Sequence, residues 1–317
     1  MDVSIIFPVR NLRTEIAGIL EHIQKETENS SCELIIVDMG SNDSTVATAL
    51  SLLHQRKLNG CVIQNGKTCP SSALNAGLQR ARGEYVTFLF ARRVYSGILE
   101  SFYTTACHTA ADMVFGSLSA DDARLAERQA ISRVVKKKEG ADYMIAALEG
   151  RLELDVAAVL LRRQFLMENQ LWFQCDCRFG YGEEFLYKCL LRAKDVVQAP
   201  AIPVRMTELE LRRAPAKPVG REVFQEIDAM VRVRDLLWCE HAQNSHLIDL
   251  MVCRRIPQAV MHCVDILIRN GFSPSAVKTE LKKDSYQRLL KIGSCTGQEL
   301  RRKIYRWNFP LHKYTLD

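Results

Sequence analysis

The sequence predicts an α/β protein with a mainly parallel sheet and helices on both faces. Across residues 3–118, short apolar runs alternate with segments whose apolar residues recur at helical spacing. Strands that alternate with helices of about 10–15 residues are typical of parallel sheets. The 317 residues, 47% hydrophobic and 25% charged, also have a globular composition, which excludes disordered and collagen-like classes.

The strands and helices of this sheet follow one another along the first two thirds of the chain. We expect strands over 3–8, 33–39, 61–64, 85–90, 112–117 and 154–161, and helices over 12–23, 45–56, 70–82, 96–110 and 179–193. The helix over 70–82 carries Ala73, Ala76 and Gly77 on a small-residue face that suits close packing on a sheet. In such sheets ligands bind at the carboxyl ends of the strands, which directs attention to residues 9–11, 38–43 and 91–94.

The remaining chain predicts a second, helical part. Four prolines between 200 and 218 interrupt the pattern, and helical spacing resumes at Arg221 with a break over 271–274. We therefore expect a domain over 1–205, a linker over 206–220 and a helical subdomain over 221–317.

Charge, cysteine usage and the chain ends limit the partners. A net charge of +6 on 317 residues is mild and gives no argument for nucleic acid. The 11 cysteines include no CxxC pair, so we expect reduced thiols and no metal site built from them. The N-terminus lacks the pattern of a signal peptide, which favours a cytoplasmic protein. The basic and aromatic stretch 301–309 suits either peripheral contact with an anionic membrane or a solvated helix end.

Five motifs, in order and at matching spacing, give the chain a family resemblance. They are residues 4–11 (SIIFPVRN), 33–45 (ELIIVDMGSNDST), 72–78 (SALNAGL), 81–89 (ARGEYVTFL) and 182–184 (GEE) with Leu191-Arg192-Ala193 after it. Over about residues 2–205 the sequence resembles a family-2 inverting glycosyltransferase of the GT-A fold, a Rossmann-like α/β domain. The resemblance implies hexosyl transfer from a nucleotide sugar, commonly UDP-linked, to a hydroxyl of a glycan or lipid-linked acceptor in polysaccharide or glycoconjugate synthesis.

The resemblance also implies roles for individual residues. Those that would bind the nucleotide are Pro8, Val9, Arg10, Asn11, Asp38 and Ser41, with Asp38 accepting a hydrogen bond from the base. Glu184 would be the catalytic base, with Glu183 capping the helix or orienting it, and Gly182 would allow a sharp turn before them. Tyr181 and Trp172 would contact the acceptor sugar, whereas Phe173 and Phe179 are expected in the core. A turn aspartate at Asp38, and acids placed in a first helical turn by the helix dipole, are the structural alternatives.

The sequence departs from the family where a divalent metal is normally held. The Asp-x-Asp after the fourth strand is replaced by Phe90-Ala91-Arg92-Arg93, and guanidinium groups only donate hydrogen bonds. We therefore expect no Mg²⁺ or Mn²⁺, with Arg92 and Arg93 binding the diphosphate instead. The alternative is a non-catalytic relative that binds nucleotide, glycan or a protein partner.

Overall fold

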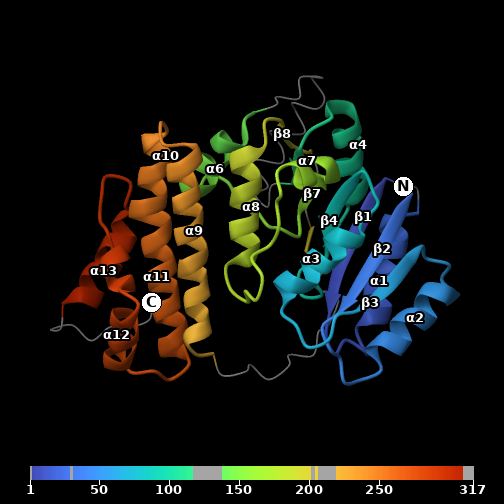
Figure 1. Cartoon of the computed structure of the whole chain (residues 1–317), viewed down its shortest axis with the longest axis horizontal. Helices are drawn as coiled ribbons and strands as arrows, with labels where there is room; N and C mark the ends of the chain where they lie inside the picture. The colour runs from blue at the N-terminus through green and yellow to red at the C-terminus, as the bar shows by residue number, and fades with distance from the viewer. Residues whose placement is uncertain (1, 29–30, 117–137, 201–203, 206–218, 310–317) are drawn as a thin grey trace.

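The computed structural model describes residues 2–28, 31–116, 138–200, 204–205 and 219–309 (Figure 1). Its centre is a seven-stranded sheet in the order β3-β2-β1-β4-β7-β6-β8. The strands are β1 (Val3–Val9), β2 (Cys32–Asp38), β3 (Gly60–Gln64), β4 (Tyr85–Phe88), β6 (Met113–Phe115), β7 (Val159–Arg162) and β8 (Val196–Gln198). Because β7 alone runs antiparallel to its neighbours, the mainly parallel sheet is confirmed.

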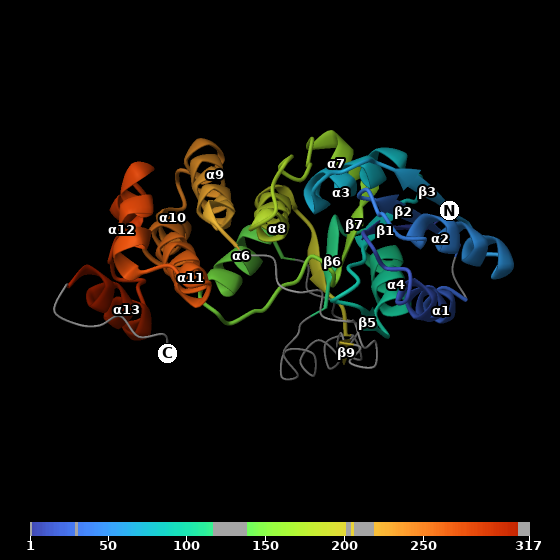
Figure 2. The ribbon, with the colours of Figure 1, turned by 90° about the horizontal axis from the view of Figure 1, so that it is seen from below.

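Helices cover both faces of this sheet, as the sequence predicts. Viewed along the sheet in Figure 2, α3 (Pro70–Arg80), α7 (Arg163–Glu168) and α8 (Tyr181–Arg192) lie on one side, and α1 (Ile16–Glu26) and α4 (Leu99–Thr109) on the other. Each side has its own buried apolar cluster. Helices α2 (Thr45–Gln55) and α6 (Gly140–Leu148) extend the two layers, and β5 (Tyr95–Ser96) pairs with β9 (Val204–Arg205) in a separate ribbon.

The small-residue face of α3 packs directly on β1. A Cβ added at Gly77 would lie 2.3 Å from Cγ2 of Ile6, a fully buried residue of β1. Only glycine therefore allows the present approach of this helix to the sheet, which confirms the packing that the sequence predicts.

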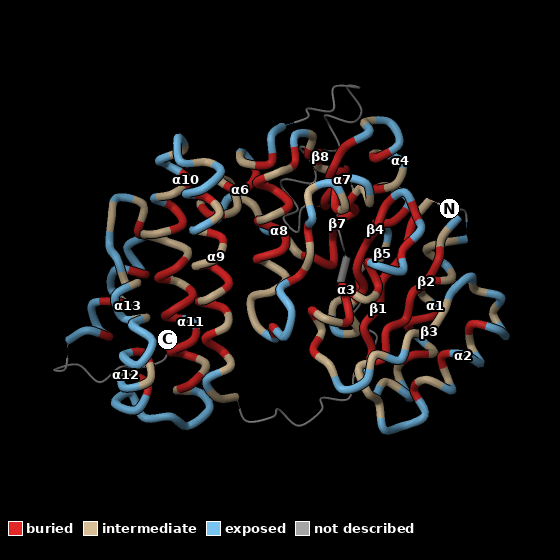
Figure 3. Tube along the Cα trace, in the orientation of Figure 1, coloured by how far each residue is buried: buried red, intermediate tan, exposed pale blue. Residues whose placement is uncertain are grey.

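The C-terminal part is helical. Its elements are η1 (Arg221–Phe224), α9 (Gln225–Glu240), α10 (Ser245–Leu250), a π-helical segment η2 (Met251–Arg255), α11 (Ile256–Arg269), α12 (Pro274–Lys283), η3 (Tyr286–Leu289) and α13 (Gln298–Asn308). The predicted break falls between α11 and α12. Burial is continuous from the sheet through α8 into α9 and α11 (Figure 3), because one apolar cluster spans both parts. The predicted linker lies almost wholly outside the described residues.

Two elements start later than predicted, because the backbone N–H groups at the predicted starts donate hydrogen bonds to groups outside the helix or strand. Thr45 and Asp43 accept the N–H groups of Leu12 and Arg13, and α1 begins only at Ile16. The strand predicted over 154–161 starts at 159, because Asp155 accepts the N–H groups of Ala157 and Ala158 and forms a turn there.

Candidate active site

The loops after β1 and β2 are bound to each other at the carboxyl edge of the sheet. The N–H of Asn11 donates to Oγ of Ser41 at 2.9 Å, and Oδ1 of Asn11 accepts from the N–H of Asn42 at 2.9 Å. Asn11 has a φ of +52°, a left-handed conformation that asparagine tolerates better than most residues. Asn11 and Ser41, both selected from the sequence, therefore lie together and form a wall at the carboxyl edge of the sheet.

Asp38 ends β2 next to this wall. Its carboxylate is buried and accepts the N–H groups of Gly40 at 3.1 Å and Ser41 at 3.2 Å. Through these bonds Asp38 forms the turn after β2, which is the structural alternative that the sequence leaves open beside base binding. Oδ2 accepts both N–H groups and Oδ1 accepts only that of Ser41, so a lone pair on Oδ1 is left for a further donor.

The other residues expected at the nucleotide differ in accessibility. Pro8 and Val9 are buried in β1, where Val9 is in register with Asp38, and Arg10 is exposed immediately after the strand. A bound nucleoside could therefore contact Pro8 and Val9 only through their backbone edge.

The segment after β4 carries Arg92 and Arg93, and the structure shows Arg93 paired with an acid. Nη1 of Arg93 lies 2.8 Å from Oδ1 of Asp155, and its guanidinium stands 4.7 Å above the ring of Phe90. The other oxygen of Asp155 accepts from the Tyr95 hydroxyl at 2.9 Å. Arg92 is exposed.

The chemistry of this donor set does not fit a divalent cation. The guanidinium groups of Arg92 and Arg93 only donate hydrogen bonds, and both oxygens of Asp155 are already bonded. Within the described part of the chain, no group of three or more His, Cys, Asp and Glu side chains could hold a metal ion.

An open pocket of about 630 Å³ adjoins Arg93. Residues 178–183 at the start of α8 form one side, and Glu226 of α9, Arg255 of η2, and Gln258 and His262 of α11 form the other. The C-terminal helices thus supply four of the eleven residues that line the pocket.

Glu184, expected from the sequence as the catalytic base, does not line this pocket. Its side chain is 1% exposed, and its two oxygens accept from Nε and Nη2 of Arg232 at 2.8 and 2.7 Å. Nζ of Lys188 lies 2.7 Å from one of them. Both Glu184 oxygens are bonded to cationic side chains and do not reach the pocket, so this geometry disfavours Glu184 in that role.

Glu183 does face the pocket, but it too is paired. The guanidinium of Arg255 binds both of its oxygens, and the Tyr187 hydroxyl donates to Oε1 at 2.7 Å. Burial opposes ionisation, but the charge and hydrogen bonds of Arg255, together with Tyr187, outweigh it and lower the pKa of Glu183.

The turn into α8 is made by Gly180 and not by Gly182. Gly180 has a φ of +75°, and a Cβ there would lie 2.9 Å from Cα of Glu226, whereas Gly182 lies inside the helix. Gly180 therefore lets α9 approach the start of α8, and brings Glu226 to the pocket that Glu183 lines.

The aromatic residues before the acids divide between core and pocket. Phe173 is buried and stacks on Phe185 at 3.9 Å, as expected. Tyr181 lines the pocket, where burial raises its pKa to about 12, and Phe179, expected in the core, also lines it. Trp172 packs against the core cluster and is not among the pocket residues.

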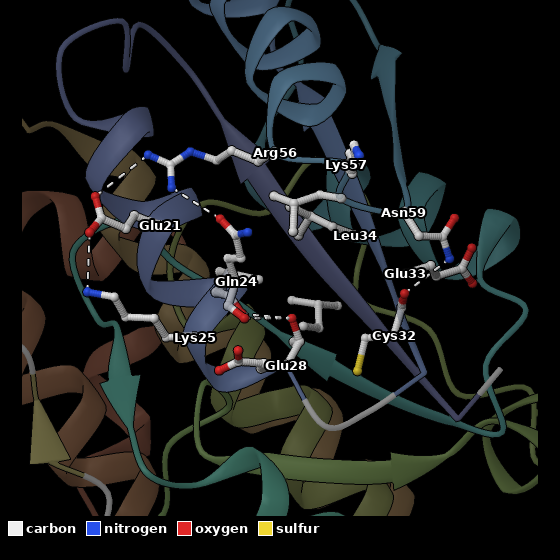
Figure 4. Close-up of a pocket in the computed structure, with 14 residues that line it drawn as sticks. Glu21, Gln24, Lys25, Glu28, Cys32, Glu33, Leu34, Arg56, Lys57 and Asn59 are labelled. Carbon is white, nitrogen blue, oxygen red and sulfur yellow. Dashed lines mark hydrogen bonds and ion pairs between the residues drawn. The ribbon is translucent and has the colours of Figure 1, made fainter.

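A second hollow, of about 520 Å³, lies away from these loops (Figure 4). It is lined by the start of β2 and the carboxyl-terminal ends of α1 and α2, and Glu21 there pairs with Lys25 and Arg56. It is thus at the amino end of a parallel strand, the opposite edge from the one where such sheets bind ligands, and we assign no role to it.

Comparison with known proteins agrees with this geometry. Residues 4–156 match the model of the family "Glycosyl transferase family 2". This stretch is similar to family 2 glycosyltransferase domains. The chain is 28% identical to glycosyltransferase GlyG of Streptococcus pneumoniae over 116 residues, 36% of this chain and 38% of the relative. It is 28% identical to the uncharacterized glycosyltransferase EpsJ of Bacillus subtilis over 231 residues, 71% of this chain and 67% of the relative.

Solved structures share the fold of this chain, including the helices after residue 219. S. aureus TarS 1-349 superposes with a TM-score of 0.63 at 14% identity, covering 96% of this chain and 90% of that one. The mannosyltransferase PcManGT of Pyrobaculum calidifontis superposes with a TM-score of 0.56, also at 14% identity, covering 96% and 83%. Among the described residues, no helix is long and apolar enough to cross a membrane.

Several residues that line the pocket or pair with a residue lining it were not found by sequence reasoning. Asp155, Glu226, Arg255 and His262 belong to no motif of the resemblance, and three of them follow residue 205, where it ends. Only Asp155, an acid just before a strand, carried a local signal.

Proposed function

We propose that the chain is an inverting glycosyltransferase that moves a sugar, hexosyl in type, from a nucleotide-sugar donor to an acceptor hydroxyl. The observation that carries the proposal is the meeting of the loops after β1, β2 and β4 at one edge of the sheet, beside an open pocket. The family match, and a TarS structure determined in complex with UDP-GlcNAc, support a nucleotide-sugar donor, which we take to be UDP-linked.

In this proposal the nucleoside lies against the wall formed by Asn11 and Ser41. The buried Asp38 carboxylate accepts a hydrogen bond from the base through a remaining lone pair. Because backbone donors and Asn11 fix this loop before any ligand binds, little ordering is needed on binding.

Arg92 and Arg93 take the place of the divalent cation. As the bond to the diphosphate breaks, negative charge develops on the leaving oxygen, and fixed guanidinium groups stabilise it. Asp155 and the Phe90 ring hold Arg93 at the pocket margin before the donor arrives. We therefore propose a reaction that needs no metal.

The acceptor binds in the pocket between α8 and α11, with Tyr181 available for stacking on a sugar ring. We propose a glycan or lipid-linked acceptor, in polysaccharide or glycoconjugate synthesis. On α13, Leu300, Ile304 and Trp307 are buried, while Tyr305 and Phe309 stack on each other and are exposed beside basic residues. This surface supports peripheral contact with an anionic membrane on the cytoplasmic side.

One observation favours a second candidate, a non-catalytic binding module. Arg93, Glu183 and Glu184 are each paired with an oppositely charged neighbouring side chain, which a purely structural role would also require.

Calorimetry with UDP, GDP and their sugars, with and without EDTA, separates the candidates. We expect UDP to bind equally in both conditions, and product to form from a UDP-sugar when a hydroxyl acceptor is added. Affinity that disappears with EDTA contradicts the arginine substitution. Nucleotide binding without any transfer or donor hydrolysis supports the binding module.

A further inference from the structure

A histidine and a buried carboxylate form a pair at the pocket that no role described so far uses. Nδ1 of His262 lies 2.7 Å from Oε2 of Glu226. Glu226 is itself buried, and Nη2 of Arg255 lies 3.1 Å from its other oxygen. The imidazole is thus anchored through Nδ1, and its ring, which is 58% exposed, lines the pocket. Nε2, on the opposite side of the ring, is left for a ligand.

The acids near this pocket are all held by cations. Glu184 is buried between Arg232 and Lys188, and Glu183 is bound through both oxygens by Arg255. Asp155 is bound by Arg93 and by a hydroxyl. Each of these carboxylates already has its oxygens bonded to neighbouring side chains, and Arg255 also lowers the pKa of Glu183. An anchored neutral imidazole is the better proton acceptor near neutral pH.

We propose that His262, oriented by Glu226, accepts the proton of the acceptor hydroxyl. The inference rests on the proposed function. The hydroxyl oxygen forms a bond to the anomeric carbon, and the bond from that carbon to the diphosphate oxygen breaks, with its electron pair staying on the diphosphate. The hydroxyl proton moves to Nε2 of His262. The resulting imidazolium is stabilised by the Glu226 carboxylate.

The charges around His262 set the direction of its pH dependence. Glu226 faces it from α9, Glu183 from α8, and Arg255 and Asp265 from its own helical segment. Arg93 and Arg178 share the pocket, and Glu299 and Lys303 of α13 share an adjoining hollow with it. The hydrogen bond and charge of Glu226 outweigh burial and raise the pKa of His262 above 6.5. Because the neutral ring is the active form, kcat/KM rises with pH through that raised pKa.

The test is the pH profile of kcat/KM for His262→Asn, Glu226→Gln and Glu183→Gln. We expect His262→Asn to lower kcat by roughly 10²-fold or more and to abolish the rising limb, with UDP affinity unchanged. Glu226→Gln should move the limb to lower pH, since the interaction that raises the pKa is lost. Glu183→Gln should keep the limb. Added imidazole should restore part of the activity of His262→Ala, a readout that a merely structural role would not give.

A matched control is His246→Asn. His246 also pairs with a glutamate, Glu149 at 3.2 Å, but it lies outside the pocket, so we expect an unchanged profile. Retention of the limb in His262→Asn, or its loss in Glu183→Gln, overturns the role of His262 and leaves the transferase proposal standing. Absence of any transfer by the wild-type protein overturns the proposed function and this role together.

Discussion

Replacing Arg232 with methionine removes the guanidinium that holds both oxygens of Glu184 between α8 and α9. Glu184 is 1% exposed and cannot regain water, and only Lys188 would remain to neutralise it. Removing one partner of a buried ion pair costs about 3–5 kcal/mol. With Lys188 retained, we expect Arg232→Met to lower the free energy of unfolding by about 2–3 kcal/mol.

The converse change should cost less. In Glu184→Gln the orphaned groups are Arg232 and Lys188, whose side chains are 34% and 20% exposed and can be hydrated. We expect a loss of about 1–2 kcal/mol. The double variant Arg232→Met/Glu184→Gln should be about as stable as Glu184→Gln, because the buried charge that Arg232 neutralises is then absent.

Urea unfolding measures these differences, and Arg234→Met is the matched control on the same helix. Arg234 pairs with the exposed Asp235 and stacks on Trp238, so about 1 kcal/mol or less is expected. Folded Glu184→Gln should transfer sugar within about threefold of wild type, because the buried Glu184 does not take the proton. Loss of a positioned base would instead lower the rate roughly 10²-fold or more. Unchanged stability in both variants, with transfer abolished in Glu184→Gln while UDP still binds, would show that Glu184 is the base and refute this reasoning.

Three further changes test the donor side and the packing beneath it. Asp38→Ala should weaken UDP binding by about 2 kcal/mol, roughly 30-fold, because a charged acceptor for the base is lost; calorimetry showing equal affinity would contradict this. Arg93→Ala should lower kcat by roughly 10²-fold and UDP-sugar KM much less, since the guanidinium acts on the developing charge; unaltered kcat would remove it from that role. Gly77→Ala should cost about 1–3 kcal/mol on unfolding, because its Cβ would meet Ile6 at 2.3 Å; an unchanged urea midpoint would refute that packing argument.

The sheet, and the meeting of Asn11 and Ser41 at its carboxyl edge, could be predicted because their signals are local. Buried strands read as short apolar runs, and the polar residues that follow, such as Asn11 and Asp38, lie next to their strands in sequence. The pairing of Glu183 and Glu226 with Arg255 and His262 at the pocket could not be predicted. These pairs join residues that lie 29 to 72 positions apart in the sequence. Which of Glu183 and Glu184 faces the pocket depends on how α9 packs on α8. The left-handed Gly180 permits that approach, and nothing in the GEE motif encodes it.

The two sides of the site also differ in what they share with relatives. The family match ends at residue 156, so it includes the donor-side Asn11, Asp38 and Arg93 but none of the pocket residues from 178 to 262. A common nucleotide-sugar donor needs a common edge of the sheet, whereas acceptors differ in shape and charge. If His262 accepts the proton, the C-terminal helices bind the acceptor and also complete the chemistry.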